Sequence, residues 1–260
     1  MADPLVIRAD DGAIAILTLN APSSLNALGT PMLLALDAAL DAIGDNVRAV
    51  ILRGGARAFS AGHDLKEIHS RRADPDGGAA AYQALFALCA RVMQKLVALP
   101  QPVIAEVRGV ATAAGCQLAA SCDLVMAADT ARFGVNGINI GLFCSTPMVA
   151  LTRKIPPSAA LEYLLTGEMI PAPRARELGL VTRTAPEEQL EQATLTLARQ
   201  IAGKLPVAIR HGKQAFRAAQ GLPLDLAYQA AGTIMCANLM EPDTAEGIDA
   251  FLAKRKPDWA

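Results

Sequence analysis

The hydrophobic pattern near the N-terminus predicts a β-hairpin. Leu5 and Ile7 are spaced by two before a turn at Asp11-Gly12, and Ile14, Ile16 and Thr18 continue this spacing after it. A period of two is typical of strands that bury one face, and Asp-Gly is a favoured hairpin turn.

The pattern then changes to helical spacing. Apolar residues recur every three or four positions over 31–43, with Thr30 as the predicted N-cap and Pro31 as the first helical residue. The run VRAVILRG that follows, starting at Val47, is almost continuously apolar. Such a run predicts a strand that is buried on both faces.

The alternation of strand and helix is repeated further along the chain. A helix is predicted over 79–99, a strand over 103–107, a helix from 114 and a strand over 124–127. Repeated βαβ units indicate an α/β fold with a parallel sheet and helices packed outside it. Such sheets bind ligands at the carboxyl ends of their strands.

The second half of the chain is predicted to be mainly helical. From 147 onward the one extended interruption covers 180–184, and the chain closes with an amphipathic helix over 244–254. We therefore expect a core over 1–195 followed by a C-terminal helical region over 196–260.

Composition narrows the classes of function. The 260 residues are 52% apolar and carry a formal net charge of −1. No basic cluster has aromatic residues interleaved, which disfavours nucleic-acid binding. No window resembles a membrane span or an export signal, so we expect a cytoplasmic protein without membrane insertion.

Cysteine and histidine usage predicts no metal and no cofactor. The five cysteines are odd in number and form no CxxC pair, which favours free thiols. The three histidines have no HExxH spacing and form no cluster with metal-ligand geometry.

Two predicted junctions between a strand and a helix contain small residues. They are FSAGHDL over 59–65 and GVATAAGCQL over 109–118. The first amides of a helix have no intrahelical partner, so two such turns together can form an oxyanion hole that a ligand carbonyl approaches closely. Tight packing turns are the alternative interpretation of each junction taken singly.

Five stretches at these spacings resemble the crotonase superfamily, also called the enoyl-CoA hydratase/isomerase superfamily. Within this superfamily, the stretches AGCQLAASCDL and NIGLFCSTPMVAL are most similar to the enoyl-CoA hydratase domain-containing proteins of the third type. The matching stretches are SLNAL (24–28), RAFSAGHDLKEI (57–68), QPVIAEVRGVATAAGCQLAASCDLVMAADTARFG (101–134), LLTGEMIPAPRARELGLVTR (164–183) and EGIDAFLAKRKPDW (246–259).

This resemblance implies a ββα spiral core, a C-terminal helical region that makes homotrimers or hexamers, and an acyl-CoA ligand. It implies an oxyanion hole formed by the backbone N–H groups of Ala61 and Ala114, where Ala114 replaces the usual glycine and keeps the N–H. The residues expected to contact coenzyme A are Leu25, Ala27, Ala58, Ala61, His63, Asp64 and Leu65, with Phe251 and Lys254 reaching a neighbouring subunit's ligand.

The same resemblance places the two glutamates of hydratases at Gln117 and Gly137. An amide cannot exchange a proton near neutral pH and glycine has no side chain, so the usual acid–base pair is missing. Gln117 can still orient water or a thioester by hydrogen bonding.

Other groups are weaker candidates for the missing chemistry. Cys144 or Ser145 could act as a nucleophile, although a buried inert thiol at Cys144 and a helix cap at Ser145 or Thr146 are the commoner interpretations. His63 is expected to make a surface or CoA-phosphate contact rather than act as a base. Asp123 and Asp129 are expected to be structural, capping or solvated carboxylates.

Two functions remain open at this point. The first is an enzyme of the enoyl-CoA hydratase/isomerase type, a lyase or isomerase of fatty acid metabolism, with an altered acid–base apparatus. The second is a non-catalytic acyl-CoA-binding trimer. A purely structural role comes third and would be favoured by a lack of acyl-CoA binding.

Overall fold

The computed structural model describes residues 3–259, and its strands form two sheets. The larger sheet has the order β1-β2-β3-β5-β7-β10, in which β1 and β2 pair antiparallel and the other neighbours pair parallel. Its strands are β1 (Val6–Asp11), β2 (Ile14–Leu19), β3 (Ala49–Arg53), β5 (Val103–Val107), β7 (Leu124–Ala128) and β10 (Arg183–Ala185). The predicted hairpin and parallel sheet are confirmed.

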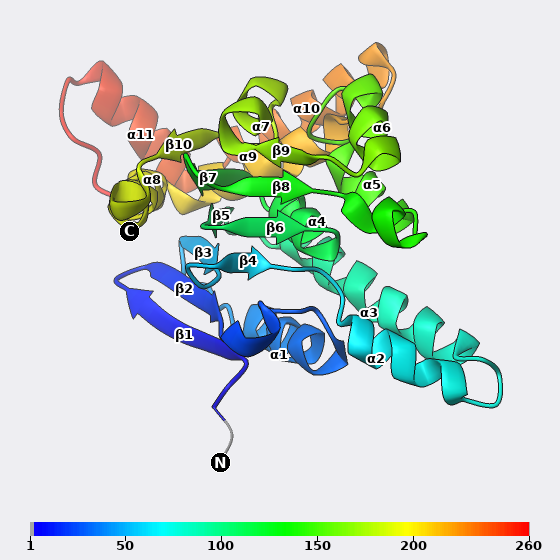
Figure 1. Cartoon of the computed structure of the whole chain (residues 1–260). Coiled ribbons are helices and arrows are strands. Elements are labelled where there is room, and N and C mark those ends of the chain that lie inside the picture. Colours follow the sequence, from blue (N-terminus) through cyan, green and yellow to red (C-terminus); the bar gives the residue numbers. More distant parts are fainter. Residues whose placement is uncertain (1–2, 260) are drawn as a thin grey trace.

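The second sheet has the order β4-β6-β8-β9 and was not visible in the hydrophobic pattern. Its strands are β4 (Ala58–Ser60), β6 (Val110–Thr112), β8 (Arg132–Gly134) and β9 (Met169–Pro171). Three residues are too few to display a period, which explains why they were missed. Figure 1 shows β4, β6 and β8 side by side in this sheet. Along the chain, they directly follow β3, β5 and β7 of the larger sheet, which confirms the expected ββα repeat.

Helices surround the sheets and follow the predicted order. They are α1 (Thr30–Asp41), α2 (Leu65–Ser70), α3 (Ala79–Ala98), α4 (Ala114–Ser121), α5 (Ser145–Leu151), α6 (Pro157–Thr166), α7 (Ala172–Leu178), α8 (Leu190–Ala202), α9 (Pro206–Ala219), α10 (Leu224–Leu239) and α11 (Pro242–Leu252). Every residue of β5 and α4 is buried. The helix that carries Gln117 is therefore held firmly within the core.

The N-cap of α1 differs from the prediction. The cap is Gly29, and Thr30 is already helical. The Thr30 amide and hydroxyl both donate to the carboxylate of Glu67 in α2, at 2.8 and 2.5 Å. Because the Thr30 hydroxyl is used in this contact, it joins α1 to α2 instead of capping its own helix.

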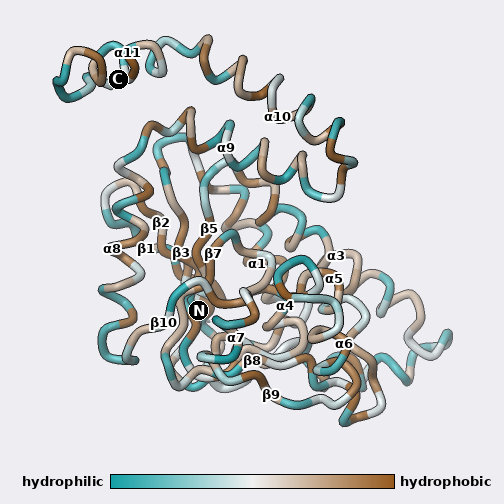
Figure 2. Tube along the Cα trace, turned by 90° about the horizontal axis from the view of Figure 1, so that it is seen from above, coloured by the Kyte–Doolittle hydropathy of each residue, from teal (hydrophilic) through white to brown (hydrophobic). Residues whose placement is uncertain are grey.

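The C-terminal helices are packed loosely against the rest of the chain. Residue 195 lies inside α8, a single helix that buries Thr194, Leu197 and Ala198 on the larger sheet, so the predicted division at 195/196 falls within a helix of the core. Helices α9 and α10 contain no fully buried residue. Figure 2 shows α10 and α11 outside the body formed by the sheets. No helix in the described part of the chain is long and apolar enough to cross a membrane.

Asn26 fixes the loop between β2 and α1 against the second sheet. It is 1% exposed and has a left-handed φ of 54°. Its Nδ2 donates to the carbonyls of Ala58 and Phe59, both at 3.2 Å, and its Oδ1 accepts from the Ala21 amide at 2.8 Å. Asparagine tolerates this backbone conformation better than other residues with a side chain.

We predict that Asn26→Ala lowers the free energy of unfolding by about 3 kcal/mol, because it leaves buried polar groups unpaired and strains the backbone. Urea denaturation followed by circular dichroism measures this change. Ser23→Ala in the same loop is the control, since Ser23 is exposed, and its unfolding midpoint should match that of the wild type. Equal midpoints for both variants would contradict the anchoring role.

Candidate functional site

The turn between β4 and α2 is built from short side chains that bind the backbone. Gly62 has a φ of +89°, which favours glycine. The Ser60 hydroxyl donates to the Asn26 carbonyl at 2.8 Å and accepts from the Gly62 amide at 3.2 Å. Asp64 caps α2 by accepting from the amides of Lys66 and Glu67. The turn therefore has one fixed conformation.

The turn between β6 and α4 is strained. Ala113 has φ 50° and ψ −120°, a region that residues with a Cβ rarely adopt. Its amide donates to the Gly134 carbonyl at 2.8 Å, which helps to hold it there. This conformation redirects the chain from the second sheet into α4, so that the Ala114 amide stands at the start of the helix, where it has no intrahelical acceptor.

The two turns lie against each other. A Cβ built on Gly62 would lie 2.9 Å from the Ala113 Cβ and 3.2 Å from the Ala114 nitrogen. The segment Gly62–His63 therefore passes directly beside the first amide of α4. Within residues 3–259, no backbone carbonyl accepts from the amides of His63 or Ala114.

The structure corrects one predicted donor of the oxyanion hole. The Ala61 amide donates to the Leu25 carbonyl at 3.0 Å, so it is not free for a ligand. The His63 amide, two residues further on, is the free donor next to Ala114. The signal that sequence reasoning missed is the glycine before it, since a left-handed Gly62 turns the following amide away from the strand ladder.

The His63 ring points into the protein and does not form the surface contact that was predicted. Its Nδ1 lies 2.9 Å from the Leu28 carbonyl, and its ring meets Phe86 edge to face at 5.3 Å between centroids. The buried Nε2 has no partner within the described residues. Burial lowers the pKa of His63 below its usual range, so the ring is neutral at pH 7.

Gln117 lies one helical turn after Ala114 and is 6% exposed. Its buried Oε1 has no hydrogen-bond partner in the part of the chain described. It lines a cavity of about 550 Å³ between α3, α4, α5 and α9. The predicted polar group therefore faces a space that can hold a ligand.

Gly137 lies in a short 3₁₀ helix, Asn136–Ile140, and has no room for a side chain. A Cβ there would collide with the Leu142 carbonyl and would lie 2.9 Å from the Cys144 Sγ. The Gly137 amide donates to the same sulfur at 3.3 Å. The Leu142 backbone and the Cys144 side chain therefore fill the space that a side chain at residue 137 would need.

Cys144 is a packing residue in this structure. It is 6% exposed, and burial raises the pKa of its thiol, which the hydrogen bond from Gly137 offsets only in part. A thiol with a raised pKa is a poor nucleophile at neutral pH. Ser145 is exposed and is the first residue of α5 rather than its cap, which is Cys144.

The residues predicted to bind coenzyme A are only partly brought together. Ala27 and Asp64 line one groove of about 640 Å³ with Arg71, and Leu25 and Leu65 are partly or largely exposed in the same two loops. Ala58 is buried in β4. Phe251 and Lys254 belong to α11 or directly follow it, at the opposite end of the molecule from α2 in Figure 1.

The remaining acidic candidates are not catalytic in this geometry. Asp123 forms ion pairs with Lys213 at 2.6 Å and Arg217 at 3.0 Å, and it accepts from the Val103 amide at 2.8 Å. Asp129 is exposed in a turn. Among the residues described, no group of three or more His, Cys, Asp and Glu side chains could hold a metal ion.

Comparison with known proteins identifies the family. Residues 9–260 match the family model described as Enoyl-CoA hydratase/isomerase. This chain belongs to the enoyl-CoA hydratase/isomerase family. It is 41% identical to enoyl-CoA hydratase domain-containing protein 3, mitochondrial, of Xenopus laevis, over 98% of this chain and 86% of that one.

Two solved structures show the same family fold. The enoyl-CoA hydratase of Mycobacterium smegmatis has a TM-score of 0.94 and 46% identity, covering 99% of each chain. Human enoyl-CoA hydratase domain-containing protein 3 has a TM-score of 0.93 and 39% identity, covering 98% of this chain and 100% of that one. The resemblance expected from the motifs is thereby confirmed.

The family relatives contradict one prediction. The domain-containing proteins from Xenopus laevis, Danio rerio, Mus musculus and Homo sapiens all carry "mitochondrial" in their names. The cytoplasmic location inferred from the chain's N-terminal composition is therefore wrong by this comparison. The composition of this chain was therefore not sufficient to predict its compartment.

We predict that placing glutamates at residues 117 and 137 does not create a hydratase. The double variant Gln117→Glu, Gly137→Glu should add water to a 2-enoyl-CoA no faster than the wild type, because the Leu142 carbonyl blocks any side chain at 137. Loss of absorbance by the conjugated thioester measures hydration. Gln117→Glu alone is the control, and rapid hydration by the double variant only would show that the wall can move.

Proposed function

We propose that this protein binds acyl-CoA thioesters and polarises the thioester carbonyl between the amides of His63 and Ala114. The observation that carries this proposal is the pair of adjacent free amides at two turns whose side chains leave the backbone open. Fixed N–H donors aimed at one oxygen stabilise negative charge that develops on it, as in an enolate. The family membership supports a CoA thioester as the ligand.

The nucleotide end of the ligand is proposed to lie along the groove that Ala27, Asp64 and Arg71 line. Arg71 supplies a cation for a phosphate, and the groove begins in the two loops that also position the His63 amide. The remaining predicted contacts, Leu25 and Leu65, project from those loops. Phe251 and Lys254 could contribute only from another subunit.

The proposed function does not include hydration by two glutamates. Gln117 is an amide, and Gly137 is closed by backbone. No carboxylate lines the cavity beside Gln117. A polarised thioester has an acidified α-proton, but the site lacks the paired carboxylates that hydratases of the family use to transfer protons.

Incubation with saturated, 2-enoyl, 3-enoyl and 3-hydroxyacyl-CoAs in heavy water, followed by mass spectrometry, tests the chemistry, and calorimetric titration tests binding. We expect saturable binding without water addition. Enzyme-dependent hydration or deuterium uptake that heat-treated protein lacks would show that another group acts as acid or base, and the protein would then be an enzyme of the hydratase/isomerase type.

We predict that Gly62→Ala weakens binding of a conjugated enoyl-CoA about tenfold, because the new Cβ intrudes beside the Ala114 amide. The red shift of the enoyl chromophore, which reports polarisation, should be lost. Gly12→Ala is the matched control, since Gly12 also has a positive φ, of 58°, but has open space around it. Wild-type affinity and red shift in Gly62→Ala would contradict the proposed hole.

We also propose that the chain forms homotrimers or dimers of trimers through its C-terminal helices. Leu224 and Tyr228 of α10 are each 74% exposed, and Phe251 of α11 is 81% exposed. Large apolar side chains gathered on unpartnered helices are typical of interfaces.

Met240, at the C-terminal end of α10, is 84% exposed. Met240→Glu combined with Phe251→Glu should therefore reduce the mass found by light scattering to that of a smaller assembly. Leu161→Glu is the control, because Leu161 is an exposed apolar residue of α6 and is outside the C-terminal helices. An unchanged mass for the double variant would exclude these residues from the interface.

A further inference from the structure

The cavity beside Gln117 has one apolar wall and one cationic wall. Met93 and Val97 of α3 and Val149 of α5 supply apolar surface. Arg153 and Lys154, which follow α5, and Arg217 of α9 supply the cations. None of the residues that line this cavity is acidic. The cavity therefore combines a path for a hydrocarbon chain with a surplus of positive charge.

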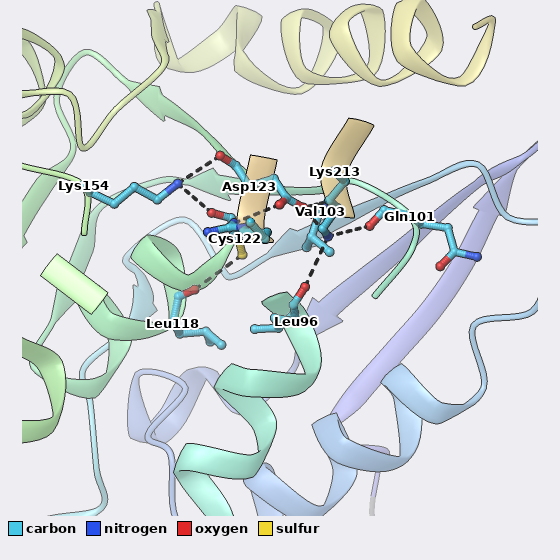
Figure 3. Close-up of polar contacts among 9 residues, drawn as sticks. Leu96, Gln101, Val103, Leu118, Cys122, Asp123, Lys154 and Lys213 are labelled. Carbon is cyan, nitrogen blue, oxygen red and sulfur yellow. Dashed lines mark hydrogen bonds and ion pairs between the residues drawn. The ribbon is translucent and has the colours of Figure 1, made fainter. Parts of the chain in front are cut away.

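The surplus charge is not neutralised by the rest of the protein. The Asp123 carboxylate already binds Lys213 and Arg217, and Glu241, which lines the adjoining pocket with these two cations, lies 3.1 Å from His211 Nε2. Lys154 donates to the carbonyls of Cys122 at 2.9 Å and Asp123 at 3.0 Å, as Figure 3 shows, and forms no ion pair. Within residues 3–259, no carboxylate lies within 4.0 Å of a cationic nitrogen of Arg153 or Lys154.

Burial makes this imbalance costly. Burial lowers the pKa of both Lys154 and Lys213, which is the expected effect of keeping a charge from water with too few counter-charges. Lys213 and Arg217 share the Asp123 carboxylate, and Lys154 pairs with no carboxylate. Charges that are removed from water are normally paired, so this site favours an anion from outside the chain.

Two unpartnered polar atoms belong to residues that line the same cavity. The Nε–H of Arg217 is buried and donates to nothing in the described residues, although another nitrogen of the same guanidinium holds Asp123. Gln117 is 6% exposed, and its buried Oε1 is likewise unpaired in the described residues. Buried groups without partners are uncommon in folded proteins and indicate a missing ligand or water.

We infer that this cavity holds the far end of the acyl group and that this end carries a carboxylate. The substrate class is thus a CoA thioester of a dicarboxylic acid, which rests on the thioester binding proposed above. From Ala114 to Ser121, α4 advances about 10 Å. The later part of this helix lines the cavity with Gln117, Ala120 and Ser121, so the cavity lies along α4 from the start that carries the Ala114 amide. The Arg217 Nε–H, Lys154 and Arg153 supply donors for the carboxylate.

The test is a titration with matched pairs of CoA thioesters of equal chain length, one ending in a methyl group and one in a carboxylate. We expect the wild type to bind the carboxylate-ended member about tenfold more tightly or better. Lys154→Met and Arg153→Gln should each reduce this preference severalfold while the affinity for the methyl-ended member stays within twofold. Arg183→Gln is the control, because Arg183 is exposed in β10 and does not line the cavity.

The outcomes separate this inference from the proposed function. If both members bind equally well, or if the methyl-ended member binds more tightly, the acidic-end inference is overturned while thioester binding stands. If neither member binds, both proposals fail. A preference that survives in both Arg153→Gln and Lys154→Met would place the carboxylate elsewhere and also overturn the inference. Because Arg153 is exposed and binds only the Val149 carbonyl, its variant is expected to fold even if Lys154→Met does not.

Discussion

The close approach of α4 to β4 is the constraint on which the candidate site depends. A Cβ on Gly115 would collide with the Ser60 backbone, 2.8 Å from its carbonyl carbon, so only glycine permits this contact. The contact brings the start of α4 beside the Gly62 turn, where the amides of His63 and Ala114 stand free. It also forces Ala113 into a conformation that alanine rarely adopts. Strain at one residue is thus the cost of two adjacent donors in a fixed position.

The sequence was sufficient to predict those helices and strands that are long enough for their apolar residues to show a period. The buried runs of β3 and β5 and the helices α1 and α3 appear where the apolar pattern predicted them. The strands β4 and β6 were not predicted because three residues are too few to show a period. The Ala61 amide was wrongly predicted as a ligand donor because the sequence does not show that the Leu25 carbonyl already accepts its hydrogen bond. Ala114 was placed in the oxyanion hole by the family resemblance, and within residues 3–259 its amide has no backbone acceptor, as is usual for the first amides of a helix.

The wall formed by α9 is held by charge rather than by apolar burial. Helix α9 contains no fully buried residue, yet Lys213 reaches the Asp123 carboxylate and the carbonyls of Leu96 and Gln101, as Figure 3 shows. Arg217 adds a second bond to Asp123. Because these bonds are partly buried, the loss of Asp123 would leave two cations unpaired. Such a wall keeps cationic groups beside the cavity that Gln117 lines, which an apolar contact between the helices would not do.

This charge distribution gives a physical reason for an amide at residue 117. A glutamate there would face a cavity lined by Arg217 and Lys154, and its carboxylate would neutralise part of the surplus charge. It would then compete with an acidic acyl group for the same cations, and the cations would in turn lower its pKa and make it a weaker proton donor. Gln117 keeps hydrogen-bonding capacity without adding a negative charge. An amide at residue 117 therefore suits the cationic wall beside it, because it leaves the positive charge of that wall available to an anionic ligand of the kind proposed above.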